Sequence, residues 1–208
     1  MNQSLDHSEH LRRPDFLSND AVSLVSEFFG IDGTAKELPG ERDRNFLIQQ
    51  SKGQRFVLKI FNQCESKELL EIQNEALTKT LNVLGSGRSP NLLVNQNNDF
   101  LTKIESKTGT QHWLRLVGYV EGIPMAEYTP HNEEFLHHLG MMCGDMTRAV
   151  HSIEHEPLQS DLLWNMNRVS GTLEKFLTYL PGPKKQGIVQ NYLQLYQKTL
   201  EPIEKQLR

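Results

Sequence analysis

A single lysine within an apolar segment is the residue of this sequence best suited to phosphate chemistry. Lys59 lies in the segment 56–61, whose alternating side chains predict a strand with Lys59 on the same side as Val57 and Phe61. Phosphoryl transfer from a nucleotide needs a cation on the phosphates, a bound metal ion and a carboxylate that orients the acceptor hydroxyl. Lys59 could supply the cation, although apolar strands with one outward lysine are also common in proteins without this chemistry.

A turn one hairpin earlier could cover the phosphates. It contains Gly40 but is not glycine-rich in the manner of protein kinases. Backbone amides together with Arg42, Arg44 or Asn45 would therefore have to donate the hydrogen bonds. A solvated hairpin turn of mixed charge explains the same residues equally well.

A helix predicted over 68–81 would have to bring a polar partner to the lysine. Glu71 and Glu75 are one turn apart on one face, and Asn74 is close to both. Any of the three could orient the amine of Lys59. Charged residues on such a helix are more often simply its solvated face.

The order of predicted elements is one helix, three strands, a second helix, several short strands, a glycine-bearing link and then helices. Asn19 or Asp20 is expected to cap the first helix, and Gly30 to end it. This order favours an α+β protein with a mixed lobe over residues 1–120, hinged to a helical part over 121–208. Strands are expected at 35–38, 45–50, 55–61, 92–95, 99–104 and 112–119, and later helices at 65–84, 135–149, 162–180 and 186–207.

Composition narrows the range of partners and compartments. The formal net charge is -4, which gives no sequence-wide attraction to nucleic acid. No apolar run approaches the ~20 residues of a membrane span, and residues 1–13 are too polar for a secretory signal, so we expect a soluble, cytoplasmic protein. Cys64 and Cys143 lack partners at metal-binding spacing, so we expect no metal site.

Several motifs, in order, resemble the aminoglycoside phosphotransferase and choline kinase superfamily. They are the Gly-Glu-Arg-Asp-Arg-Asn-Phe of 40–46, the Phe-Val-Leu-Lys of 56–59, the Glu-Ile-Gln-Asn of 71–74, the strand and link of 114–124, the helix of 139–147 and the Trp-Asn pair within 163–166. The hydroxylysine kinases are the closest match, and the resemblance runs from about Pro14 to Arg208.

The resemblance implies a protein-kinase-like fold that binds ATP or GTP with Mg²⁺ and phosphorylates an amino alcohol such as 5-hydroxylysine. It implies phosphate contacts from Lys59 and the loop from Gly40 to Asn45. It also implies an adenine-binding hinge formed by backbone atoms around Leu116, Val117 and Tyr119. Where many members of the superfamily have a glutamate to pair with the lysine, this sequence has Asn74, although Glu71 or Glu75 could substitute.

The superfamily's catalytic loop, His-Gly-Asp-x-x-x-x-Asn, and its Asp-Phe-Gly-like metal motif are absent from the 208 residues. Asp145 is predicted to lie inside a helix and does not replace them, so we assign no catalytic residue and no metal ligand. We expect a truncated kinase that is inactive alone and self-associates through apolar helix faces. Two alternatives remain open: the kinase-like amino-terminal part of a pyridoxal-phosphate-dependent class-III aminotransferase fusion, and a non-catalytic nucleotide-binding module.

Overall fold

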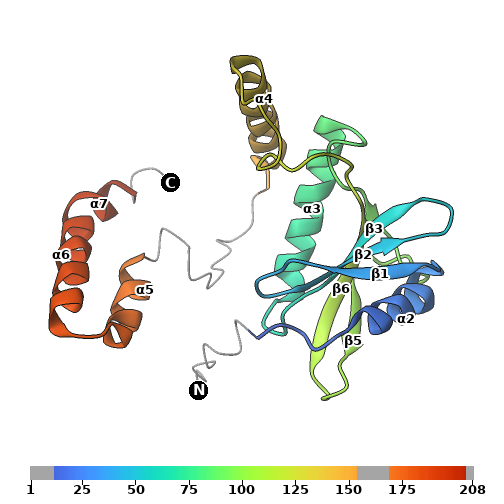
Figure 1. Cartoon of the computed structure of the whole chain (residues 1–208), viewed down its shortest axis with the longest axis horizontal. Coiled ribbons are helices and arrows are strands. Elements are labelled where there is room, and N and C mark those ends of the chain that lie inside the picture. Colours follow the sequence, from blue (N-terminus) through green and yellow to red (C-terminus); the bar gives the residue numbers. More distant parts are fainter. Residues whose placement is uncertain (1–11, 154–168, 205–208) are drawn as a thin grey trace. The chain divides into compact units, whose positions relative to one another are not determined.

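The first unit of the chain, Met1–His155, is organised around one sheet of six strands whose pairings are all antiparallel (Figure 1). The structure is a computed structural model that describes residues 12–153 and 169–204. The strands follow the order β1, β2, β3, β6, β4, and β5 pairs with another part of β6. Their bounds are β1 Thr34–Leu38, β2 Arg44–Gln49, β3 Arg55–Ile60, β4 Leu92–Leu93, β5 Thr102–Glu105 and β6 Gln111–Gly118.

One face of the sheet forms the main hydrophobic core. Alternation along each strand sends every second side chain to this face, where helix α2 (Ser18–Phe29) covers it with Ala21 and Val25. The expected faces of residues 56–61 are therefore confirmed, with Lys59 on the side opposite the core. The fully buried strand residues of the core are Phe46, Ile48, Leu58, Ile60, Leu114 and Leu116.

The start of α2 differs from the expectation. The helix begins at Ser18 with Leu17 in the capping position, so the predicted capping role of Asn19 or Asp20 is wrong. Asp20 instead reaches back from the third helical position, where its Oδ2 accepts a hydrogen bond of 2.8 Å from the Leu17 N–H. Gly30 ends the helix as expected, because its φ of 64° is a conformation that glycine adopts without steric cost.

Helix α3 (Lys67–Leu84) packs on the second face of the sheet. Its N-cap is Ser66, whose Oγ accepts a hydrogen bond of 3.2 Å from the Leu69 N–H. Leu70 is fully buried in a small cluster with Phe61, Leu101 and the partly buried Trp113. The predicted helix is thus confirmed and lies on the same side of the sheet as Lys59.

The strands after α3 are shorter than expected. β4 stops at Leu93 and β5 begins only at Thr102, because the side chain of Asn95 organises a turn between them. Asn95 Oδ1 accepts hydrogen bonds of 2.9 Å from the N–H groups of both Asn97 and Asp99. These local bonds take the place of strand pairing across the predicted ends.

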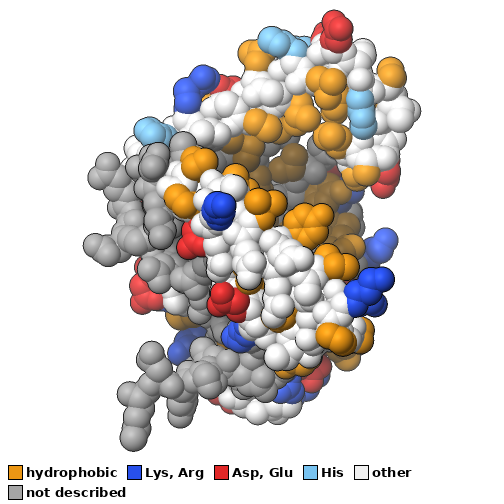
Figure 2. All heavy atoms as spheres, turned by 90° about the vertical axis from the view of Figure 1, so that its left-hand side faces the viewer, with side chains coloured by type: hydrophobic (Ala, Val, Ile, Leu, Met, Phe, Trp, Pro, Cys, Tyr) orange, Lys and Arg blue, Asp and Glu red, His pale blue; other side chains and the backbone are white. Residues whose placement is uncertain are grey.

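Helix α4 (Glu133–Val150) confirms the helix expected through 135–149 and packs alongside α3. Asn132 caps its start, and its Oδ1 accepts a hydrogen bond of 2.9 Å from the Phe135 N–H. Several apolar side chains of α4 are exposed, namely Leu136, Met141, Met142, Met146 and Val150. Figure 2 shows hydrophobic side chains at the surface in orange.

The second unit, Glu156–Arg208, contains helices α5 (Val169–Phe176), η2 (Leu177–Tyr179), α6 (Pro183–Thr199) and α7 (Glu201–Glu204). The gap expected between the helices at 162–180 and 186–207 is present but shorter, with Gly182 at a φ of 82° and Pro183 opening α6. The helix expected at 186–207 is interrupted at Leu200. Residues 162–168, with the Trp-Asn pair, lie outside the described residues. The expected lobe boundary at residue 121 stays a prediction.

Within the described ranges, none of the helices has the length and apolar character needed to span a bilayer.

Candidate functional site

Lys59 stands in the middle of the sheet face that α3 partly covers. Its strand neighbours directly opposite are Asn45 on β2 and Arg115 on β6, so the three side chains leave the same face. Lys59 Nζ lies 3.0 Å from Asp43 Oδ2, in an ion pair whose side chains are 32% and 18% exposed. The amine also lies 5.0 Å from the centre of the Phe61 ring.

Arg115 is a second cation on this face, and only 8% of it is exposed. Its Nη1 donates a hydrogen bond of 2.8 Å to Asn74 Oδ1, and its Nη2 donates one of 3.3 Å to Gln73 Oε1. The guanidinium carbon lies 4.9 Å from the centre of the Phe61 ring. Burial lowers the pKa of Arg115 to about 10, partly opposed by the charge of Asp43, so the group remains cationic at neutral pH.

The turn before β2 is fixed to the segment that follows β3. Asp43 Oδ1 accepts a hydrogen bond of 2.8 Å from the Asn62 N–H, while the other oxygen of Asp43 faces Lys59. Arg42 forms an ion pair of 3.0 Å with Glu65, and both side chains are mostly buried. The loop expected to cover phosphates is therefore held next to Lys59 by contacts within the protein.

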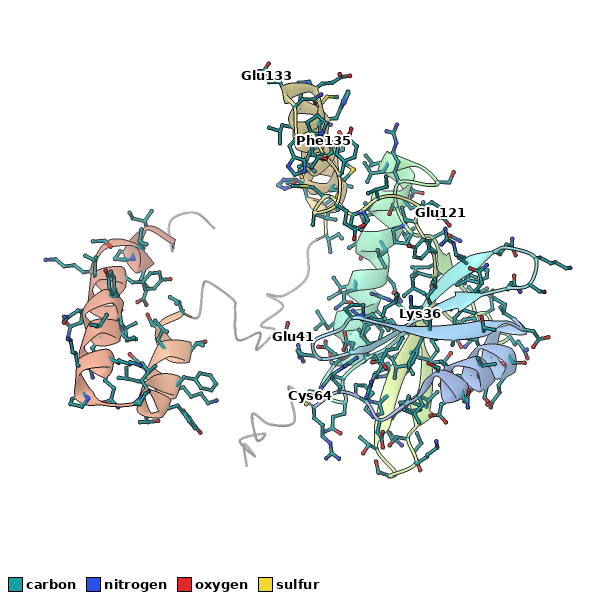
Figure 3. All side chains as sticks on the ribbon, in the orientation of Figure 1. Lys36, Glu41, Cys64, Glu121, Glu133 and Phe135 are labelled. Atoms are coloured by element: carbon teal, nitrogen blue, oxygen red, sulfur yellow. The ribbon has the colours of Figure 1, made fainter. Side chains whose placement is uncertain are left out.

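Close packing explains the single glycine of this turn. A Cβ at Gly40 would lie 2.5 Å from the Asp43 carbonyl oxygen and 2.7 Å from Asn45 Nδ2, so no side chain fits there. Asn45 Nδ2 donates a hydrogen bond of 3.2 Å to the Pro39 carbonyl. The labelled Glu41 marks the turn in Figure 3.

Arg44 lies away from this face. It pairs across the strands with Ile60, whose side chain is in the main core. Its Nη1 lies 2.6 Å from Glu37 Oε1 and its Nε donates a hydrogen bond of 2.9 Å to the Pro14 carbonyl. We therefore leave Arg44 out of the candidate site.

The three polar residues considered on α3 have different contacts. Glu71 pairs with Lys67 at 3.1 Å and Glu75 with Lys79 at 3.4 Å, both along the helix itself. Asn74 instead points to the sheet and binds Arg115. The ion pair shown for Lys59 thus comes from the turn before β2, whereas α3 is linked to the neighbouring arginine.

A cavity of about 700 Å³ lies beside α3, and Lys59 is not among the residues that line it. Glu71, Asn74 and Glu75 line it together with Phe100 and Trp113. Asn74 therefore faces both this cavity and the arginine of the candidate site.

In the segment proposed as the hinge, Leu116 and Val117 are paired with β3 on one side and with β4 on the other, and the next two N–H donors are also used within the protein. Gly118 N–H donates to the Asn91 carbonyl at 2.9 Å, and Tyr119 N–H donates to the Arg55 carbonyl at 3.1 Å. The Leu116 side chain is buried in the core, whereas Val117 is half-buried on the face of Lys59. Adenine contacts in this segment would therefore rest on apolar packing and on the remaining backbone groups.

Apolar side chains continue the candidate site toward β4. Four apolar side chains on the face of Lys59 are neighbours across successive strands. In their order across the sheet they are Leu47 on β2, Val57 on β3, Val117 on β6 and Leu92 on β4. All four are half-buried. A flat apolar ring could pack on this strip while its charged end lies near Lys59 and Arg115.

The described part of the chain contains no cluster of three or more His, Cys, Asp or Glu able to hold a metal ion. Asp145 lies within α4 and forms an ion pair with Arg148 one turn later.

Sequence reasoning missed Arg115 because its position beside Lys59 depends on the pairing of β3 with β6, more than fifty residues apart. The available signal was a charged residue alternating with apolar ones in 112–119, the same signal that singled out Lys59.

No family model matches the chain. A hydroxylysine kinase of Danio rerio is 24% identical over 200 residues, which cover 91% of this chain and 55% of that protein. An amicoumacin kinase, solved in complex with AMP-PNP and Ca²⁺, superposes with a TM-score of 0.58 at 13% identity, covering 79% of this chain and 53% of its own. The chain thus spans about half the length of the relatives it matches. The chain is thus similar in sequence to a hydroxylysine kinase along most of its length, and it shares its fold with a small-molecule kinase of known structure.

Proposed function

We propose that this chain is the nucleotide-binding part of a small-molecule kinase that transfers phosphate from ATP or GTP to the hydroxyl group of an amino alcohol. The observation that carries the proposal is the position of Lys59, a strand-borne cation next to a strip of apolar side chains on the same face of the sheet. A nucleotide combines a flat apolar base with a polyanion, and this face offers a matching strip and cation side by side.

In this proposal the adenine packs on Val57 and Val117, and the segment around Leu116 and Tyr119 contributes backbone contacts. The phosphates lie at Lys59, which exchanges Asp43 for a phosphate oxygen. The turn from Gly40 to Asn45 stays next to the phosphates and supplies backbone N–H donors. Arg42 contributes only if it leaves Glu65.

Magnesium is not part of the chemistry that we assign to the described residues. Asp43 is the carboxylate paired with Lys59, and one of its oxygens is already hydrogen-bonded to the Asn62 N–H. That arrangement, with no cluster of three suitable ligands in the described ranges, does not fit a bound metal. Any such ion would arrive with the nucleotide or be held by other residues.

We propose 5-hydroxylysine as the acceptor, on the strength of the similarity to a hydroxylysine kinase. The 208 residues contain neither a His-Gly-Asp-x-x-x-x-Asn segment nor an Asp-Phe-Gly segment. We therefore assign nucleotide binding to this chain, and proton transfer from the acceptor to residues that it lacks. A general base alone typically contributes ~10²- to 10⁴-fold to the rate.

A nucleotide-consumption assay with 5-hydroxylysine, ethanolamine and serine tests this function. It is run on the chain as given and on a version extended with the superfamily's catalytic loop and metal motif. We expect turnover only in the extended version, and fastest with 5-hydroxylysine. Turnover by the short chain that Asp145→Asn abolishes would contradict the proposed site, and inactivity of both versions would contradict the kinase function.

A further inference from the structure

Arg115 carries a charge that its own hydrogen bonds leave unneutralised. A guanidinium has five N–H donors, and the hydrogen bonds described for Arg115 use two of them, both to neutral side-chain amides of α3. Asp43 attracts it only through space, and Asp43 is engaged with Lys59 and the Asn62 N–H. Burying a cation to 92% without a directly bonded anion costs free energy. Binding of an anion to Arg115 would lower this cost.

The charges around Arg115 add up to an anion-binding environment. Lys59 and Arg115 are directly opposite each other on neighbouring strands, and both contact the ring of Phe61. Among the described residues, Asp43 is the carboxylate that interacts with both cations, as the ion-pair partner of Lys59 and through space with Arg115. The pair therefore keeps an excess positive charge in a partly desolvated place, where electrostatic attraction to an anion is stronger than in water.

The amides of α3 set the direction of the guanidinium. Asn74 and Gln73 bind its two terminal nitrogens from the helix side, which fixes the plane of the group. A planar guanidinium held in this way is pre-organised to bind two oxygens of a phosphate group. This accounts for asparagine at position 74, because a glutamate there would neutralise Arg115.

We propose that Arg115 is a second phosphate-binding residue, which together with Lys59 binds the triphosphate, while Asn74 and Gln73 are residues that position it. This inference rests on the proposed function and extends the site to β6. A residue that only connected α3 to the sheet would affect stability but would not distinguish a ligand with phosphates from one without.

The test measures three ligands by titration calorimetry: ATP, inorganic tripolyphosphate and adenosine. We expect Arg115→Gln to weaken the binding of ATP and of tripolyphosphate by about 10- to 100-fold, the effect of losing one charge-assisted contact, and to leave the affinity for adenosine unchanged. Arg115→Lys keeps the charge but not the planar guanidinium, so its affinities should lie between those of the wild type and Arg115→Gln. Asn74→Ala keeps the guanidinium and loses its orientation, so a smaller loss is expected. Arg44→Gln, which removes a sheet arginine on the other face, is the matched control and should change none of the affinities.

The inference is wrong if Arg115→Gln binds ATP and tripolyphosphate as the wild type does while Lys59→Ala does not. It is also wrong if Arg115→Gln weakens the binding of adenosine as much as the binding of ATP, since that result would show that Arg115 has a structural role only. Tripolyphosphate that binds through Arg115, with no binding of adenosine, would refute the proposed nucleotide site and keep the anion site. A wild-type protein that binds none of the three ligands would overturn both.

Discussion

Lys59 on β3 is paired with Asp43, a carboxylate of the turn before β2, at 3.0 Å between Nζ and Oδ2. The turn that would cover the phosphates therefore also provides the partner of the lysine. Helix α3 approaches the same face through Asn74, which binds Arg115. Anchoring of the helix and pairing of the lysine are thus separate contacts in this protein.

Replacing Asp43 by Asn should have opposite effects on stability and on ATP binding. The variant loses an ion pair that is partly exposed, so we expect the free energy of unfolding to fall by about 1 kcal/mol. It also removes a negative charge beside the proposed phosphate site, which should strengthen ATP binding by about fivefold. Chemical denaturation and calorimetry measure the two effects. ATP binding as weak as in Lys59→Ala would show instead that Asp43 orients the lysine.

Two neighbouring residues of β3 test which face binds the nucleotide. Leu58 is fully buried in the core, so Leu58→Ala should lower the free energy of unfolding by about 2–5 kcal/mol without changing adenosine affinity per folded molecule. Val57 lies on the other face, so Val57→Ala should cost about 1 kcal/mol and weaken adenosine binding. The reverse pattern of adenosine binding would place the nucleotide on the α2 side.

The elements of this fold were predictable where local patterns determine them. Alternation in 56–61 identified β3 and its two faces, and Gly30 marked the end of α2. The ends of β4 and β5 were not predictable, because a side chain, Asn95, competes with strand pairing for the backbone donors.

The candidate site was predictable only in part. Lys59 could be found from its own strand, since an isolated charge among apolar neighbours is visible in the sequence. Asp43 and Arg115 could not be assigned as its neighbours, because their proximity depends on a fixed turn and on the pairing of β3 with β6. Spacing along α3 placed Asn74 near Glu71 and Glu75 but could not tell which of them turns to the sheet.

His112 should make the fold sensitive to mild acid. It is buried, its Nδ1 lies 2.9 Å from the Phe61 carbonyl oxygen, and burial lowers its pKa below the ordinary value. The unfolded chain then binds a proton more readily than the folded one, so stability is full above pH ~6.5 and falls as the pH drops below it.

The measurement is the free energy of unfolding at pH 7.5 and 5.5. We expect the wild type to lose more stability over this interval than His112→Asn, whereas His137→Gln, on the exposed surface of α4, should behave as the wild type does. Equal losses in the wild type and His112→Asn would remove His112 as the cause.

The apolar surface of α4 should promote self-association. Leu136 and Met141 are exposed, and both line a hollow of about 590 Å³ with Asp145 and Arg148. We expect the double variant Leu136→Gln, Met141→Gln to sediment with a lower average mass than the wild type at the same concentration, with His138→Gln, an exposed residue of α4 that does not line the hollow, as the control. An unchanged mass distribution would exclude this face as the cause of association.

The central claim is that Lys59 binds the phosphates of a nucleotide, and calorimetric titration of ATP tests it most directly. Lys59→Ala alone would leave Asp43 unpaired, so the informative comparison is between Asp43→Asn and the double variant Asp43→Asn, Lys59→Ala. We expect the loss of the lysine to weaken the binding of ATP by about 1.5–3 kcal/mol, or roughly 10- to 150-fold, and to leave adenosine binding unchanged. Equal ATP affinity with and without Lys59 would contradict the account.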